Sequence, residues 1–293
     1  MFFQQLINGL SLGSIYALIA LGYTMVYGIV LLINFAHGDI LMAGAYAAFY
    51  VLNRFGVTPA GIVAAFLFAM TVCACLGAGI ERFAYRPLRG APRLNALITA
   101  IAVSLILQNA ARLLPFIGPN PRQFPRPDIH TITIANFSIS NIQLIVIITS
   151  ALLMVALNYI VNHTKRGKAM RAVSFDMQAA SLMGISVDAT ISFTFALGSI
   201  LAAAGGILFA FAYPQISPTM GTMPGLKAFV AAVFGGIGSI PGAMLGGILL
   251  GLAETFTKSI NSQYADAISF SILIIILLVK PTGIMGAKAK VKV

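Results

Sequence analysis

The sequence predicts an all-α fold, a polytopic bundle of about eight transmembrane helices that forms a single domain over residues 1–293. Only 9% of the residues are charged, whereas an ordinary soluble domain carries about 25%. Hydrophobic residues make up 59% of the chain, and its mean hydropathy is +0.95. The apolar runs are continuous, unlike the short alternating segments of a membrane β-barrel. These observations exclude a soluble enzyme, a nucleic-acid binder and a disordered scaffold.

Eight apolar runs follow one another along the chain. A helix needs about 20 residues to cross the hydrocarbon core, so each run is interpreted as a membrane segment. No lysine or arginine precedes Arg54, so the first run lacks the basic start of a cleavable signal peptide and is expected to stay in the membrane. The runs cover residues 6–22, 23–52, 60–80, 94–114, 142–161, 190–212, 226–256 and 265–279.

Basic residues gather in three groups, at residues 82–93, 165–171 and 280–292. Basic loops of membrane proteins stay preferentially in the cytoplasm, which also accounts for the net charge of +11 without a nucleic-acid partner. Two runs separate the first two groups, so both can be cytoplasmic, and segment 115–141 is then extracytoplasmic. Eight straight crossings would leave the third group outside. We therefore expect one late run not to cross as a single straight helix.

Two runs contain interruptions that predict broken helices. Residues 234–242 interrupt the run 226–256 with glycines and a proline, which are poor in a helix interior. Residues 33–39 interrupt the run 23–52 with polar groups. Two interrupted segments in corresponding halves indicate an internal inverted repeat with a translocation pathway between the halves. The residues expected to line this pathway are Asn34, His37, Asp39, Gly235, Gly236, Gly238, Ser239 and Pro241.

Each of these polar residues also has a structural interpretation. Asp39 could be only the N-cap of a helix over residues 40–52, and His37 could be a packing residue. Glu254 has Lys258 four residues later, and an ion pair between them explains both. Two pairs of glycines, each pair spaced by four residues, form a small-residue face that predicts close helix packing. They are Gly242, Gly246, Gly247 and Gly251.

The polar loop 162–188 is expected to carry a short amphipathic helix over residues 172–183 that ends at Gly184. Such a helix could lie on the membrane surface or dock against a cytoplasmic partner, and the pattern alone favours neither. The sequence contains no phosphate-binding loop, no metal-ligand spacing and no nucleophile elbow. We therefore expect neither an enzyme nor a cofactor.

Five segments, residues 8–18, 33–39, 178–180, 227–229 and 235–242, resemble the permease subunits of bacterial branched-chain amino-acid ABC importers, and more closely the shorter of the two permeases in such a system. The resemblance implies a multi-pass protein of the bacterial inner membrane. It also implies partners: a second homologous permease in a heterodimer, two ATP-binding subunits and a periplasmic binding protein that delivers Leu, Ile or Val. ATP hydrolysis would then belong to another chain.

ABC importers commonly carry a Glu-Ala-Ala-x-x-x-Gly motif in a cytoplasmic coupling loop, and this chain keeps the spacing but has Gln178 in place of Glu. The resemblance implies that loop 162–188 docks on the ATP-binding subunits, although this departure leaves the contacts open. Permeases for urea, amides, sugars or nucleosides remain alternatives, as do an ion-coupled transporter that uses Asp39 or Glu254 and a passive channel. The residues expected to couple are Phe175, Asp176, Gln178, Ala179, Ala180 and Gly184.

Overall fold

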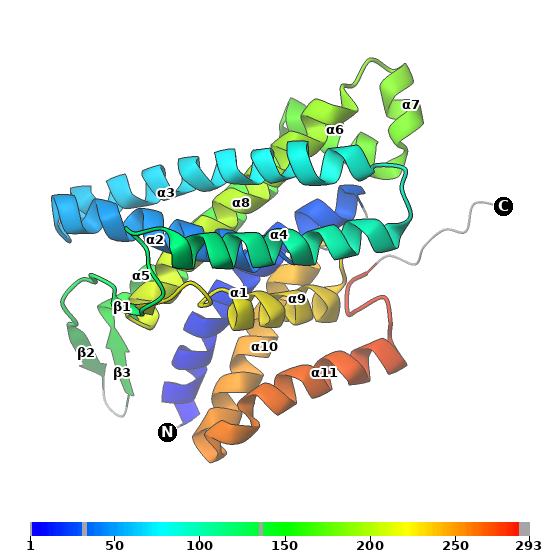
Figure 1. Ribbon diagram of the computed structural model, residues 1–293. Coiled ribbons are helices and arrows are strands. Elements are labelled where there is room, and N and C mark those ends of the chain that lie inside the picture. Colours follow the sequence, from blue (N-terminus) through cyan, green and yellow to red (C-terminus); the bar gives the residue numbers. More distant parts are fainter. Residues whose placement is uncertain (1, 31–33, 135–136, 287–293) are drawn as a thin grey trace.

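A computed structural model describes residues 2–30, 34–134 and 137–286 (Figure 1). These residues form a helical bundle with four short strands gathered at one end. The helices are α1 (Phe2–Val30), α2 (His37–Phe55), α3 (Pro59–Ile80), α4 (Arg93–Leu113), α5 (Asn141–His163), α6 (Lys165–Phe175), α7 (Met177–Leu182), α8 (Val187–Ala212), α9 (Thr222–Gly235), α10 (Ile240–Ile260) and α11 (Ala265–Val279). The strands are β1 (Arg122–Gln123), β2 (Thr131–Ile134), β3 (Phe137–Ser140) and β4 (Gln215–Ile216).

Within the described residues, seven helices are long and apolar enough to cross a membrane. The polytopic bundle is therefore confirmed, with seven such helices where the sequence predicted about eight runs. Helices α2 and α9 are not among the seven, which accounts for much of the difference between the two numbers. The predicted boundary between residues 22 and 23 is wrong, because nothing in that stretch breaks a helix and α1 continues to Val30. Ile33, which belongs to the predicted first break, lies outside the described residues.

The predicted break inside residues 226–256 is confirmed: α9 ends at Gly235 and α10 begins at Ile240. Gly236 and Gly238 adopt φ angles of 109° and 93°, which other residues rarely adopt. Helix α9 has 14 residues and is too short to cross alone. Three helices that could span the membrane, α8, α10 and α11, therefore follow α6. An odd number of crossings is what places the basic groups at residues 165–171 and 280–292 on the same side of the membrane. The lysines at 288, 290 and 292 lie outside the described residues.

Apart from α5–α7, the chain consists of two structurally similar halves, α1–α4 and α8–α11. In each half the first, third and fourth helices are among the seven that could span a membrane and the second helix is not. The packing is reciprocal, because α1 packs on α10 as α8 packs on α3, and α1 packs on α9 as α8 packs on α2. Helices α1 and α8 cross each other antiparallel at the centre, where Gly22 meets Gly198 and Ile19 meets Gly205. These contacts support the expected inverted repeat.

The turns that follow the two short helices have the same chemistry. Thr58 Oγ1 accepts a hydrogen bond from the Gly61 backbone N–H at 3.1 Å, and Ser239 Oγ accepts one from Gly242 at 3.2 Å. Both are N-caps, and a proline follows within the first two helical positions. The turn at residues 236–239 thus corresponds to residues 56–58, not to residues 33–39 as the sequence suggested. The break before α2 corresponds instead to the segment before α9.

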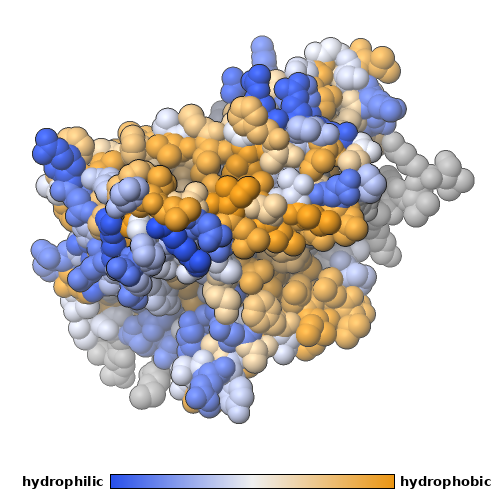
Figure 2. All heavy atoms as spheres, viewed as in Figure 1, coloured by the Kyte–Doolittle hydropathy of each residue, from blue (hydrophilic) through white to orange (hydrophobic). Residues whose placement is uncertain are grey.

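The bundle has two polar ends separated by an apolar belt (Figure 2). We call the end with α6, α7 and the α9–α10 turn the α7 end, and the end with the four strands the strand end (Figure 1). At the strand end, β1 pairs with β4 and β2 pairs with β3, both antiparallel. The predicted packing glycines lie along α10. A Cβ on Gly247 would come within 2.6 Å of the Ala17 Cβ, and one on Gly251 within 2.9 Å of the Gly9 carbonyl oxygen.

Candidate functional site

The two short helices α2 and α9 begin inside the bundle, where their N-termini meet. His37, the first residue of α2, packs against Gly22 and Tyr23 of α1, well before α1 ends at Val30. A Cβ on Gly38 would lie 2.5 Å from the Gly221 carbonyl oxygen, so only glycine permits this backbone contact. From this point α2 runs towards the strand end and α9 towards the α7 end. The site therefore lies between two helices that start inside the bundle and run in opposite directions.

A cavity of about 280 Å³ opens beside this crossing, between α2, α4 and α9. Its wall is largely apolar, with a few hydroxyl, amide and carboxylate groups. Neither Ala36 nor Gly221 provides a side-chain cap, so the positive ends of both helix dipoles remain available beside the cavity. Such a cavity suits a small solute with one apolar part and few charges. It is lined by Tyr23, Phe35, Gly38, Asp39, Ile101, Ser104, Leu105, Gln108, Gly221, Thr222, Gly225 and Leu226.

Asp39 is the charged residue of this cavity. It lies in the first turn of α2, where the helix dipole stabilises a carboxylate. The expectation that Asp39 is an N-cap is wrong, because the helix begins two residues earlier, at His37. Its Oδ1 accepts a hydrogen bond from Gln108 Nε2 at 2.9 Å, and the residue is 2% exposed. Among the described residues, no cation forms an ion pair with Asp39.

The other expected pathway residues lie elsewhere. Asn34 Oδ1 accepts hydrogen bonds from the Tyr85 hydroxyl at 2.9 Å and from the Ala36 N–H at 3.1 Å, which fixes the chain before α2. The imidazole of His37 is buried with its ring 4.6 Å from that of Tyr23. The remaining expected residues form the α9–α10 turn at the α7 end and do not line the cavity: Gly235, Gly236, Gly238, Ser239 and Pro241.

Sequence reasoning missed the α4 and α9 sides of this cavity. Ser104 and Gln108 are four residues apart in an apolar run, a spacing that places two polar groups on one helix face. Gly221 and Gly225 repeat the spacing in α9. These signals were present in the sequence, although nothing there indicated that the two faces meet at Asp39.

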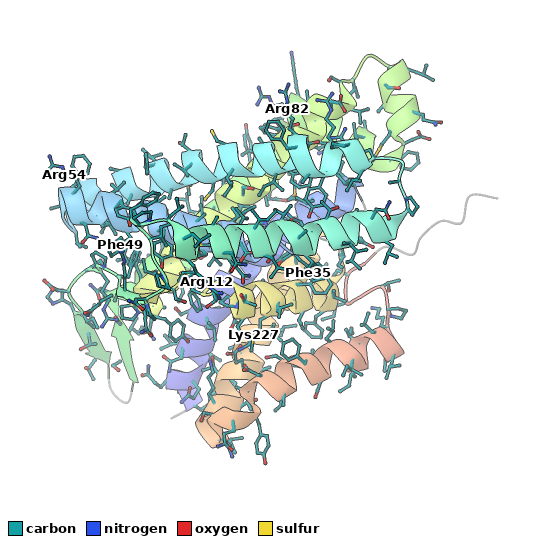
Figure 3. All side chains as sticks on the ribbon, in the orientation of Figure 1. Phe35, Phe49, Arg54, Arg82, Arg112 and Lys227 are labelled. Atoms are coloured by element: carbon teal, nitrogen blue, oxygen red, sulfur yellow. The ribbon has the colours of Figure 1, made fainter. Side chains whose placement is uncertain are left out.

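A second charged cluster joins α1, α9, α10 and α11. The predicted pair of Glu254 and Lys258 is confirmed, with 2.6 Å between Oε1 and Nζ. Glu254 also accepts hydrogen bonds from Lys227 at 2.8 Å and from the Tyr16 hydroxyl at 2.9 Å. Lys227 in turn pairs with Asp266 at 2.6 Å (Figure 3 labels Lys227 on α9). We call these five residues the Glu254 cluster. The sequence signal for this cluster was Lys227, a lone lysine within an apolar run, and sequence reasoning missed it.

The expected single helix over residues 172–183 is wrong, because Asp176 ends α6 and starts α7. The Asp176 carboxylate accepts hydrogen bonds from the backbone N–H groups of Gln178 at 2.9 Å and Ala179 at 3.0 Å, as an N-cap does. Gly184 adopts a φ of 80° and ends α7. Ala180 is buried, whereas Leu182 and Met183 are 86% and 83% exposed. The α7 end thus presents an apolar tip beside the basic helix α6 (Figure 2).

Seven apolar helices, two inverted halves and two helices that start inside the bundle beside a cavity are typical of a membrane transport protein. The chain belongs to the family described as "Branched-chain amino acid transport system / permease component", which matches residues 5–277.

Among its relatives, the high-affinity branched-chain amino acid transport system permease protein BraD of Pseudomonas aeruginosa is 43% identical over 97% of this chain and 96% of its own. The corresponding LivH protein of Escherichia coli K12 is 44% identical over 97% and 96% of the two chains. A probable branched-chain amino acid transport permease of Methanocaldococcus jannaschii is 29% identical over 93% and 89%. No solved structure shows a significant match. The findings place the chain in the bacterial inner membrane as a multi-pass protein.

Proposed function

We propose that this chain is a permease subunit of an ATP-driven importer for branched-chain amino acids and forms half of the translocation pathway. The observation that carries the proposal is the family match over nearly the whole chain, together with an internal cavity between inverted halves. ATP hydrolysis belongs to partner chains, because this sequence has no phosphate-binding loop. A second homologous permease, two ATP-binding subunits and a periplasmic binding protein complete the transporter.

The α7 end faces the cytoplasm in this proposal. Basic side chains concentrate there, on α6 and at the end of α3, as the positive-inside rule requires. The strand end, including segment 115–141, then faces the periplasm. The family relation supports this orientation, because an importer receives its solute outside and its energy inside.

Loop 162–188 is the coupling element. Leu182 and Met183 stand exposed on the apolar tip, and the short helix α7 is rigidly capped at both ends by Asp176 and Gly184. A groove of an ATP-binding subunit would cover these apolar side chains. A movement of α7 would pass to α8 through residues 183–186. It would also pass to the end of α3 through Arg89, which pairs with both Glu81 and Asp188. The two halves would then tilt and open the cavity to one side at a time.

The cavity between α2, α4 and α9 is the intramembrane solute site of the proposal. Its apolar wall accommodates an aliphatic side chain, and Asp39 offers a carboxylate to the α-ammonium group. The N-terminus of α9, which has no side-chain cap and no acidic residue in its first turn, favours the α-carboxylate. The polar groups are few, so the solute binds weakly enough to leave.

Uptake of labelled leucine by proteoliposomes tests the function. The chain reconstituted alone should show no uphill uptake, and the complex with its second permease, ATP-binding subunits and binding protein should accumulate leucine only with ATP. Uphill uptake by the single chain would overturn the proposal in favour of an ion-coupled transporter. Accumulation of urea, an amide, a sugar or a nucleoside instead of leucine would overturn the substrate class.

A pair of variants tests the coupling element within this complex. Leu182→Asp combined with Met183→Asp should lower ATP-dependent uptake at least tenfold, because two charges would enter an apolar interface. Ile132→Asp is the matched control, since Ile132 is a 58% exposed apolar residue at the opposite end. Full uptake by the double variant would show that the ATP-binding subunits dock elsewhere.

A further inference from the structure

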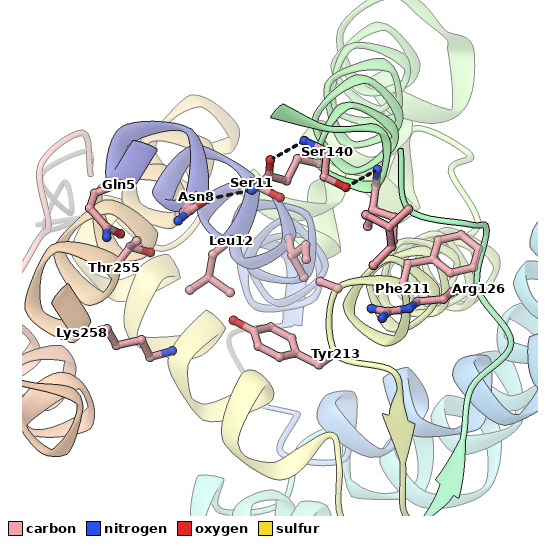
Figure 4. A pocket seen from close by; sticks show the side chains of 15 residues that line it. Gln5, Asn8, Ser11, Leu12, Arg126, Ser140, Phe211, Tyr213, Thr255 and Lys258 are labelled. Atoms are coloured by element: carbon pink, nitrogen blue, oxygen red, sulfur yellow. Dashed lines mark hydrogen bonds between the residues drawn. The ribbon is translucent and has the colours of Figure 1, made fainter. Parts of the chain in front are cut away.

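A second and larger cavity, of about 460 Å³, lies at the strand end between the ends of α1, α5, α8 and α10 (Figure 4). It shares no lining residue with the cavity around Asp39. The proposed orientation makes it periplasmic, on the side from which solute arrives. Neither the proposed coupling at the α7 end nor the contact between α2 and α9 requires a cavity here.

Two basic side chains reach into this cavity from different elements. Arg126 comes from the segment before β2, and Lys258 comes from the last turn of α10, with Tyr213 between them (Figure 4). Arg126 forms no hydrogen bond or ion pair with any residue that the structure describes. Lys258 pairs with Glu254, whose charge is already shared with Lys227. No acidic residue lines the cavity, and Arg126 is a lining basic side chain without a partner among the described residues.

The rest of the wall contains both polar and apolar side chains. Asn8 and Gln143 bond to each other at 2.7 Å, so these polar groups are fixed before any ligand binds. The apolar lining offers aliphatic and aromatic surface for a short branched hydrocarbon chain. It consists of Leu12, Ile15, Ile129, Ile142, Phe211 and Ala212.

We propose that this cavity is a periplasmic receiving site for a monocarboxylate with a short apolar chain, and that Arg126 binds the carboxylate. The ligand of the transporter, an α-amino acid with a branched side chain, belongs to this class, so the inference rests on the proposed function. The site recognises the carboxylate and the hydrocarbon chain but not the ammonium group, because the lining contains no acidic side chain. The ammonium would first meet a carboxylate deeper in the bundle, at Asp39.

Ligand-observed NMR with the chain alone in nanodiscs tests the site directly. Leucine and 4-methylpentanoate, which lacks the ammonium group, should bind with dissociation constants within about threefold of each other. Leucinamide, which lacks the carboxylate, should bind at least tenfold more weakly. Equal binding of leucine and leucinamide, or no saturable binding of leucine, would overturn the inference.

Variants locate the binding within the chain. Arg126→Gln should weaken leucine binding at least tenfold, because it removes a charge-assisted hydrogen bond. Arg54→Gln is the matched control, an exposed arginine at the strand end outside the cavity, and should change binding less than twofold. An Arg126→Gln protein that folds and binds leucine unchanged would contradict the assignment.

The two proposals fail in different experiments. If the full complex imports leucine with ATP but the chain alone binds none, the receiving site is wrong and the transport function stands. If the chain binds leucine as described but the complex does not import it, the transport function is wrong.

Discussion

Helices α2 and α9 hold equivalent places in the two halves, yet their buried charges have opposite sign and different surroundings. Asp39 of α2 lines a cavity and has the neutral amide of Gln108 as its hydrogen-bond donor. Lys227 of α9 lies between two carboxylates, those of Glu254 and Asp266. A buried charge costs several kcal/mol unless it is compensated. Lys227 is fully compensated and fits a structural role, whereas Asp39 keeps the capacity to bind a ligand.

The structural side of this comparison is tested most strongly at Lys227. Lys227→Met should lower the free energy of unfolding by about 3 kcal/mol, because it leaves Asp266 without its partner and Glu254 with Lys258 alone. Unfolding by SDS in mixed micelles measures the change. The double variant Lys227→Met with Asp266→Asn should recover part of it, since the unpaired carboxylate is gone. A Lys227→Met protein of unchanged stability would make the cluster dispensable for the fold.

A substitution at the contact between α2 and α9 is expected to lower the stability less than the substitution of Lys227. Gly38→Ala should cost about 2 kcal/mol of unfolding free energy, because the new Cβ would lie 2.5 Å from the Gly221 carbonyl oxygen and both backbones would have to move. Gly28→Ala provides the control, since its nearest atom beyond its own helix would be at 3.5 Å, an ordinary contact. That variant should be neutral or slightly stabilising. Equal effects of the two substitutions would show that the crossing is not tightly packed.

The functional side is tested at Asp39. Asp39→Asn keeps the size of the side chain and removes the charge, so it should lower ATP-dependent leucine uptake about tenfold, equivalent to about 1.4 kcal/mol, with little change in stability. Asp128→Asn, at an exposed acid of the strand end, should leave uptake unchanged. If instead Asp39→Asn unfolds the protein and uptake per folded molecule is normal, then Asp39 is as structural as Lys227.

Long continuous apolar runs were predictable from the sequence, and their partners were not. The runs 60–80 and 142–161 match α3 and α5 within two residues at each end, because polar residues or proline flank them. The boundary between the first two runs was misplaced, since the residues on both sides of it are equally apolar and form one helix. Asp39 and Gln108 are 69 residues apart and meet only through the packing of α4 against α2. Pairings of this kind depend on tertiary packing.

The smallest effect is expected at the two matched caps. Thr58→Ala and Ser239→Ala should each lower the unfolding free energy by about 1 kcal/mol, because each removes one hydrogen bond to a backbone N–H at a helix start. The two turns lie far apart, so the effects should add in the double variant. Their influence on transport should differ, since residues 236–239 lie beside α6 at the coupling end and residues 56–58 do not. Ser239→Ala should therefore reduce the uptake of leucine per ATP hydrolysed, and Thr58→Ala should leave it unchanged. The same reduction in both variants would mean that the two halves move as one rigid unit, and the asymmetry inferred from their buried charges would not extend to transport.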